Sequence, residues 1–251
     1  MPFTAAHPAV ILPLIHRRSR FLSATGLVVG AIVPDFEYFF EIEKPFRTSH
    51  TLPGIFLFNL PVAILIALLF HAFVREVVVE HLPPFLRKKI KPQGNSKWFS
   101  YLRRNWPFFL ISIIIGTLSH LLWDSFTELD GRLLEKLSPF LVEKVFILGF
   151  GMERGRILQH LSTAAGLVVV IWYIMKQPAV RPQIEQQKVW EWLKFWVMIS
   201  LFALLYLYLA WPKQAIAEPL TRAVVILISG GLLGLLFLSL VYRLKANLAR
   251  A

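Results

Sequence analysis

Five long apolar runs limit what this chain can fold into. They lie at residues 52–74, 106–123, 157–175, 195–211 and 224–242. Each run is close to the roughly 20 residues that an α-helix needs to cross the hydrocarbon core of a bilayer. The chain of 251 residues contains 56% hydrophobic and 17% charged residues, which is too apolar for an ordinary soluble domain. We therefore expect an all-α, polytopic membrane helix bundle with about five full spans.

The N-terminal region does not fit the pattern of a full span. Residues 5–15 are too short to cross, and the apolar stretch at residues 21–42 is interrupted by Pro34 and Asp35. We interpret this region as a partly embedded helical hairpin that turns at HRRSR, residues 16–20. Because this basic cluster follows the first apolar stretch, we expect no cleavable signal peptide.

The positive charge of the chain follows the expected membrane topology. Of the 27 Lys and Arg residues, 18 lie in four segments, which are the turn after His16, residues 75–105, residues 176–194 and the tail from Arg243. Alternating spans place all four segments on one side, which the positive-inside rule identifies as cytoplasmic. We therefore expect a multi-pass protein of the cytoplasmic (inner) membrane of a bacterium, with a cytoplasmic C-terminus. Membrane lipid is the expected partner, and the net charge of +12 does not indicate nucleic-acid binding.

The sequence suggests three parts along the chain. Residues 1–176 form a membrane bundle, residues 177–194 a polar cytoplasmic linker, and residues 195–251 a two-span hairpin. Two glycine pairs, Gly26 with Gly30 and Gly230 with Gly234, have the spacing that lets membrane helices approach closely. We expect them to pack helices within the bundle, and the oligomeric state is left open.

Residues able to bind a metal gather on one side of the expected bundle. The chain has no cysteine, so any metal would need His, Asp or Glu ligands. His120 and Asp124 are four residues apart and share a helix face. On the expected topology, six candidate ligands from separate parts of the chain lie toward the outer side, namely His7, Asp35, His50, His120, Asp124 and His160. Imidazole and carboxylate groups are the thiol-free ligands of Zn²⁺, the first choice here, and of Mn²⁺ or Fe²⁺.

Each of these residues also has a structural interpretation. A single histidine at a helix end is commonly an interfacial residue, and a His–Asp pair one turn apart can clasp a fold. Ionisable groups at membrane depth are costly to desolvate, however, so a cluster of them indicates function. The shared side of the membrane favours a metal site.

Several motifs resemble a known family. The segments MPFTAAHPAVILPL, GAIVPDFEYF, RTSHTLPGIFLFNLP, GTLSHLLWDSFTELDG and LQHLSTAAGL closely resemble the bacterial membrane family catalogued as domain of unknown function 4184. The resemblance covers most of the chain up to about Met175. That family has no established activity, so the resemblance implies membership and no chemistry.

The order of these motifs is also similar, more distantly, to inner-membrane metal-dependent hydrolases and to zinc-dependent phospholipase C. That similarity implies candidate metal ligands at His7, Asp35, His50, His120 and Asp124, with Asp35 alternatively a general base. Phe46 stands where the membrane hydrolases tend to carry a histidine, and Ala164 where the phospholipase group has a glutamate. We therefore expect one metal ion.

A metal at this site predicts a hydrolase of a lipid-linked or phosphate-ester substrate at the outer membrane face. The metal would act as a Lewis acid, with Asp35 or Glu128 as the base that accepts a proton from water. Arg47 could hold a phosphate group through its guanidinium. A non-enzymatic structural or partner-binding protein is an alternative. A His/Asp proton-relay transporter is a second one, disfavoured because the last two spans are almost purely apolar.

Overall fold

The computed structural model describes residues 4–16, 21–40, 48–90, 95–127, 143–147, 150–179, 189–211 and 219–248. Within these residues the chain is helical apart from one two-stranded ribbon. Five helices are long and apolar enough to cross a membrane, at Leu52–Glu80, Lys97–Phe126, Arg154–Lys176, Trp190–Ala210 and Pro219–Ala246. The predicted all-α bundle with five spans is therefore confirmed.

The helices and strands follow the chain in this order: η1 (Thr4–Ala6), α1 (Pro8–His16), α2 (Ala24–Ile32), η2 (Val33–Asp35), α3 (Phe36–Phe40), α4 (Leu52–Gly54), η3 (Ile55–Asn59), α5 (Leu60–Leu69), η4 (Phe70–Val74), α6 (Arg75–Glu80), α7 (Pro84–Arg87), α8 (Asn95–Thr127), β1 (Lys144–Ile147), β2 (Phe150–Glu153), α11 (Arg154–Lys176), α12 (Val189–Ala210) and α13 (Pro219–Leu248). The elements η3 and η4 are π-helical turns, so the first span from α4 to α6 is one apolar rod interrupted twice.

The described residues belong to two compact units. One comprises Met1–Asp35, Arg47–Ala67 and Leu102–Lys176, and the other Phe36–Phe46, Leu68–Tyr101 and Gln177–Ala251. Two of the five spans, Leu52–Glu80 and Lys97–Phe126, contribute residues to both units. The three-part division suggested by the sequence stays a prediction.

The first unit is built on close contact between helices α2 and α8. A Cβ atom added to Gly30 or to Gly116 would collide with the backbone of the facing helix, so only hydrogen fits at both positions. Gly26 has the same role, since an added Cβ would lie 2.7 Å from the carbonyl oxygen of Phe109. This backbone-to-backbone packing is the close approach that small residues allow in membrane helices, and it sets the end of α2 beside the later turns of α8.

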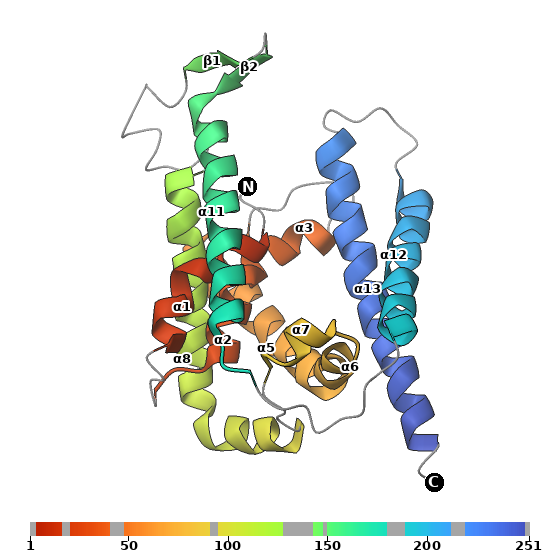
Figure 1. Ribbon diagram of the computed structural model, residues 1–251. Helices are drawn as coiled ribbons and strands as arrows, with labels where there is room; N and C mark the ends of the chain where they lie inside the picture. Colours follow the sequence, from red (N-terminus) through yellow and green to blue (C-terminus); the bar gives the residue numbers. More distant parts are fainter. Residues whose placement is uncertain are drawn as a thin grey trace. The chain divides into compact units, whose positions relative to one another are not determined.

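The N-terminal segments pack around this pair, and helix α1 contacts both α2 and α11 (Figure 1). Ile11, Leu27 and Ala31 form a small buried core between α1 and α2. The predicted hairpin is therefore present as two short helices with the turn between them outside the described residues, while its depth in a membrane stays a prediction.

The second unit is organised around the hairpin of α12 and α13. Gly230 and Gly234 face α12, where an added Cβ on Gly230 would lie 2.7 Å from Cβ of Tyr206. Val77, Phe195, Ile199 and Leu238 form its buried core. Arg243 of α13 forms an ion pair with Glu76 of α6 at 2.5 Å. Both predicted glycine pairs thus pack helices within the chain.

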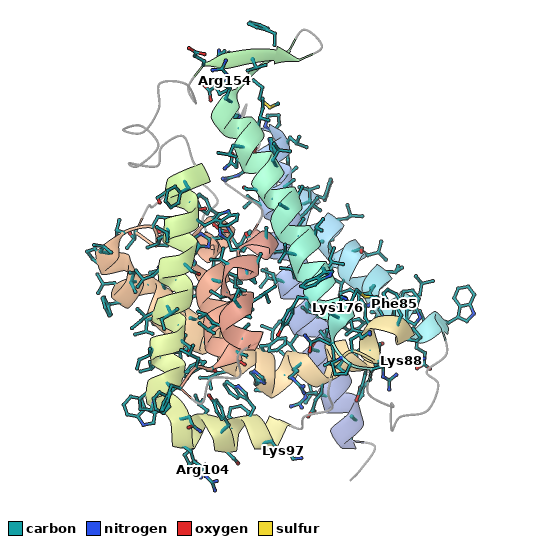
Figure 2. The ribbon with its side chains drawn as sticks, turned by 60° about the vertical axis from the view of Figure 1, so that its left-hand side comes forward. Phe85, Lys88, Lys97, Arg104, Arg154 and Lys176 are labelled. Carbon is teal, nitrogen blue, oxygen red and sulfur yellow. The ribbon has the colours of Figure 1, made fainter. Side chains whose placement is uncertain are left out.

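Two regions differ from the sequence-based expectation. Residues 75–105, expected to be a loop, contain α6, α7 and the first turns of α8, which bends at Asn105 with φ −128° and ψ 24°. The loop expected between the second and third spans contains an antiparallel ribbon, in which Lys144 pairs with Glu153 and Ile147 with Phe150. The ribbon leads into Arg154, and Arg154 and Lys176 mark the two ends of α11 (Figure 2).

Candidate metal centre

Four side chains of the first unit meet at one place. They are Asp35, His50, His120 and Asp124, and each offers a nitrogen or oxygen atom that lies within 4.8 Å of the others. Asp35, His120 and Asp124 are buried, and His50 is partly exposed. The arrangement is a compact group of metal-ligand atoms contributed by three separate segments of the chain.

Helix α8 supplies two of the four residues. His120 and Asp124 are one turn apart, and Nε2 of His120 lies 3.0 Å from Oδ2 of Asp124. Gly116 lies one turn earlier, where α8 touches α2. The contact that brings the helices together therefore also fixes the height of the His–Asp pair along α8.

Asp35 reaches the site from the end of the N-terminal hairpin. Pro34 has no backbone N–H to continue the hydrogen bonding of α2, and the chain tightens into η2, which ends at Asp35. The side chain of Asp35 is 2% exposed and lies 3.5 Å from Nε2 of His120. A break in a short helix thus points a carboxylate toward the pair on α8.

His50 lies in a tightly bonded turn ahead of the first span. The hydroxyl of Thr51 donates to the carbonyl of Thr48 at 2.8 Å and accepts from the backbone N–H of Gly54 at 3.1 Å. Gly54 is required there because a Cβ would overlap the carbonyl of Thr48. Nε2 of His50 lies 3.4 Å from Oδ2 of Asp124 and 3.9 Å from Oδ1 of Asp35.

His7 lies beside the four-residue group. Its ring stacks on that of His120 with centroids 3.8 Å apart, and its Nε2 is 3.6 Å from Oδ1 of Asp124. The residue sits between η1 and α1, where Ala6 packs against Gly166 of α11. Burial lowers the pKa of His7, which lies outside the five candidate spans, to about 4, and repulsion from His120 adds to this shift. His7 is therefore neutral near pH 7 and keeps a nitrogen lone pair.

The separations between these atoms match those in a metal site. Two ligand atoms that are each about 2.1 Å from a tetrahedral metal are about 3.4 Å apart. Four nitrogen-to-oxygen distances between the histidines and the carboxylates of this group run from 3.0 to 3.9 Å, and all four ligand atoms lie within 4.8 Å of one another. The group could therefore accept an ion with small shifts of its side chains.

The hydrogen bonds of His120 show which nitrogen faces the cluster. Its Nδ1 lies 2.8 Å from the carbonyl oxygen of Ala31, and because a carbonyl only accepts, Nδ1 carries the proton. Such a bond fixes the tautomer and leaves Nε2 for a metal. Nε2 of His120 and both carboxylate oxygens of Asp35 and of Asp124 are buried and have no hydrogen-bond partner. A neutral Nε2 facing two carboxylates would be repelled, so this arrangement calls for a cation, either a proton or a metal ion.

The structure brings most of the predicted site residues together but not all of them. It brings together five of the six candidate ligands, namely His7, Asp35, His50, His120 and Asp124. His160 is an exposed residue of α11 and is not a member of the four-residue group. Glu128, the second candidate base, and Arg47, the candidate phosphate ligand, lie outside the described residues.

Supporting residues around the site were not predicted from the sequence. Asn59, fully buried in η3, donates through Nδ2 to the carbonyl of Ser49 at 2.7 Å. The hydroxyl of Ser49 lies 2.8 Å from Nδ1 of His50. The signal for Asn59 was present, because one amide inside the apolar run GIFLFNLP is costly to bury without a purpose. The carbonyl of Ala31 has no sequence signal, since every residue carries one.

Together, the fold and the cluster define a helical protein with five membrane-type spans and a buried His/Asp group that could hold a metal ion. A family model described as "Domain of unknown function (DUF4184)" matches residues 1–240, and the chain belongs to this family. No curated protein and no solved structure matches the chain. The more distant similarity to membrane hydrolases stays a prediction.

Proposed function

We propose that the protein is a metal-dependent hydrolase that acts on a lipid-linked or phosphate-ester substrate at the outer face of the bacterial inner membrane. One observation supports this proposal above all others. Buried histidine and carboxylate groups from distant segments converge with spacings close to those of a metal site. Buried charges are costly unless they are paired or bind a metal, so two buried carboxylates whose oxygens lie within 4.8 Å of two histidine nitrogens favour an ion.

The chemistry of the donors suits metal-assisted hydrolysis. The site offers imidazole nitrogens and carboxylate oxygens, which suit Zn²⁺ first and Mn²⁺ or Fe²⁺ as alternatives. A divalent ion held there would polarise a substrate oxygen and lower the pKa of water to about 7. His120, His50 and Asp124 are the proposed ligands, with His7 as a further nitrogen donor beside Asp124.

Asp35 is the proposed general base or shared ligand. Neither of its carboxylate oxygens has a hydrogen-bond partner, so one can face the ion while the other accepts a proton from water. Glu128 is the alternative base, and Arg47 is the proposed contact for a substrate phosphate. Both stand close in sequence to cluster residues, three before His50 for Arg47 and four after Asp124 for Glu128.

The position of the cluster along α8 supports a substrate at a membrane surface. Nineteen residues separate the bend at Asn105 from Asp124, which corresponds to about 28 Å of helix, close to the thickness of the hydrocarbon core. If the basic residues before Asn105 mark the cytoplasmic surface, as the positive-inside rule indicates, the cluster lies near the outer surface and the C-terminus is cytoplasmic. A lipid-linked substrate could then present its polar group to the ion.

The alternatives predict other arrangements. A proton relay needs titratable groups in a chain through the depth of the bundle, whereas these ligand atoms gather within 4.8 Å. A purely structural role would need only an ion pair between His120 and Asp124, and it leaves unexplained why Asp35, His50 and His7 meet at the same place. The compact cluster therefore favours a metal site over both.

The test is hydrolysis by protein purified in detergent and loaded with Zn²⁺ or Mn²⁺. The probes are bis(p-nitrophenyl) phosphate and a fluorescent phospholipid, and the variants are Asp35→Asn and Asp124→Asn, with Ser200→Ala as control because Ser200 is an exposed residue of α12. We expect turnover by the wild type and the control, and a loss of about 100-fold or more in both Asp variants. Metal-loaded protein that hydrolyses neither probe class, or Asp variants as active as the wild type, would contradict the proposal.

A further inference from the structure

We propose that the first turns of α8, residues 95–105, form an interfacial arm that binds anionic phospholipid headgroups. The arm presents Lys97, Arg103 and Arg104 to the outside of the protein. This proposal concerns the opposite end of α8 from the metal centre and does not depend on the proposed hydrolase activity.

The arm leaves the direction of the span at a definite point. Asn105 has φ −128° and ψ 24°, outside the helical region, and Pro107 has no backbone N–H for the hydrogen bond that would straighten the helix. The arm therefore does not continue the axis of the span.

The two faces of the arm differ in chemistry. Trp98 is buried and its ring stacks on that of His71, with centroids 3.9 Å apart and planes at 5°. Lys97 and Arg104 lie two helical turns apart on the exposed side, and Figure 2 shows both on the arm. One face is thus fixed to protein by an aromatic contact, while the other offers cationic groups, as in amphipathic helices that lie on a membrane surface.

The positive charge here is not neutralised locally. Residues 81–123 contain seven Lys and Arg residues and no Asp or Glu. Among the described residues, Lys97, Arg103 and Arg104 are all exposed, and the ion pairs of the chain are formed by other cations. An uncompensated basic cluster beside a span attracts anionic lipid over a distance of about a Debye length.

The surroundings of the arm favour lipid over other anions. Trp106, at the bend, is 58% exposed. Tryptophan beside basic residues at the end of a span is typical of the headgroup region, where the ring lies among acyl chains and headgroups and the cations face phosphate. A soluble anion would gain nothing from the exposed apolar ring of Trp106.

Native mass spectrometry of the detergent-purified full chain, titrated with phosphatidylglycerol or phosphatidylcholine, tests this proposal. The variant is Arg103→Gln with Arg104→Gln. The control is Lys144→Gln with Arg156→Gln, which removes two exposed cations from the ribbon and the start of α11. A basic side chain near an anionic surface contributes about a fivefold effect on binding, so we expect phosphatidylglycerol affinity to fall about 25-fold in the arm variant alone.

Three results would overturn the proposal. The first is equal binding of phosphatidylcholine and phosphatidylglycerol by the wild type. The second is an equal loss of phosphatidylglycerol affinity in the arm variant and in the control. The third is displacement of bound lipid by millimolar inorganic phosphate that is as effective as displacement by added phosphatidylglycerol. The last result would identify a simple anion site. The arm variant is expected to keep the melting temperature of the wild type, so a folding defect is separated from lost binding.

Discussion

Nε2 of His120 and Oδ2 of Asp124 are 3.0 Å apart, which is close enough for an ion pair when Nε2 carries a proton. Because Nδ1 of His120 donates to the carbonyl of Ala31, the second nitrogen and the carboxylate face a shared volume that Asp35 also borders. Repulsion between these groups is relieved when a cation occupies that volume. This relationship is the basis for the predictions below.

Replacement of His7 should weaken metal binding, while replacement of His160 should not. His7 is buried with its Nε2 at 3.6 Å from Asp124, whereas His160 is exposed on α11. In His7→Ala we expect the dissociation constant for Zn²⁺, measured by competition with a chromogenic chelator, to rise on the order of 10-fold or more. His160→Ala is the matched control, and equal effects of the two changes would contradict the assignment.

Asn59 should hold the turn that carries His50. Asn59→Leu keeps the size of the side chain but removes its hydrogen bond to the carbonyl of Ser49, which leaves a buried acceptor unpaired. We expect a loss of about 1–3 kcal/mol in stability, seen as a lower melting temperature, together with weaker metal binding.

The control for Asn59 is Ser200→Ala, which also removes a side-chain hydrogen bond to a backbone carbonyl but lies on the exposed surface of α12. It should change neither property. An Asn59→Leu protein with unchanged metal affinity would show that the turn does not need this amide.

Gly166 should matter to the site although it is not a ligand. An added Cβ there would lie 2.9 Å from Cβ of Ala6, the residue before His7. In Gly166→Leu we expect η1 to be displaced, with about 1–3 kcal/mol of overpacking strain and weaker metal binding. Gly231→Leu is the control, because no atom lies within 4 Å of a Cβ at Gly231. Similar metal affinities in both variants would show that the contact between Gly166 and Ala6 does not support the site.

Much of the fold was predictable because the length of an apolar run that crosses a bilayer is set by the thickness of the hydrocarbon core. The five apolar runs correspond to the five long helices, although each helix extends beyond its run, as α8 does by starting at Asn95. Those extra turns are polar or basic and stabilised by contacts such as Trp98 on His71, which hydropathy does not detect. The ribbon of β1 and β2 was missed because its short strands lie within a segment bounded by charged residues.

The site was only partly predictable for a similar reason. The spacing of His120 and Asp124 indicates a shared helix face, and the predicted topology places His7, Asp35 and His50 on the same side of the membrane as this pair. Sequence does not show that His160 is an exposed residue of α11 and not a member of the four-residue group, because that depends on how α11 packs against α1 and η1. The support from the Ala31 carbonyl depends on the backbone contact at Gly30 and Gly116, which becomes visible only in three dimensions.

The most direct test of the central claim is metal analysis by mass spectrometry on protein purified in detergent without chelator. The wild type is compared with His120→Ala and Asp124→Ala, with His160→Ala as control and size-exclusion elution as the check on folding. We predict about one Zn²⁺ or Mn²⁺ per chain in the wild type and the control, and loss of that metal in both site variants while each still elutes as a folded species. A wild type that holds no metal as purified and takes up none on reloading would contradict this prediction, and the His/Asp group would then be a polar clasp within a membrane bundle.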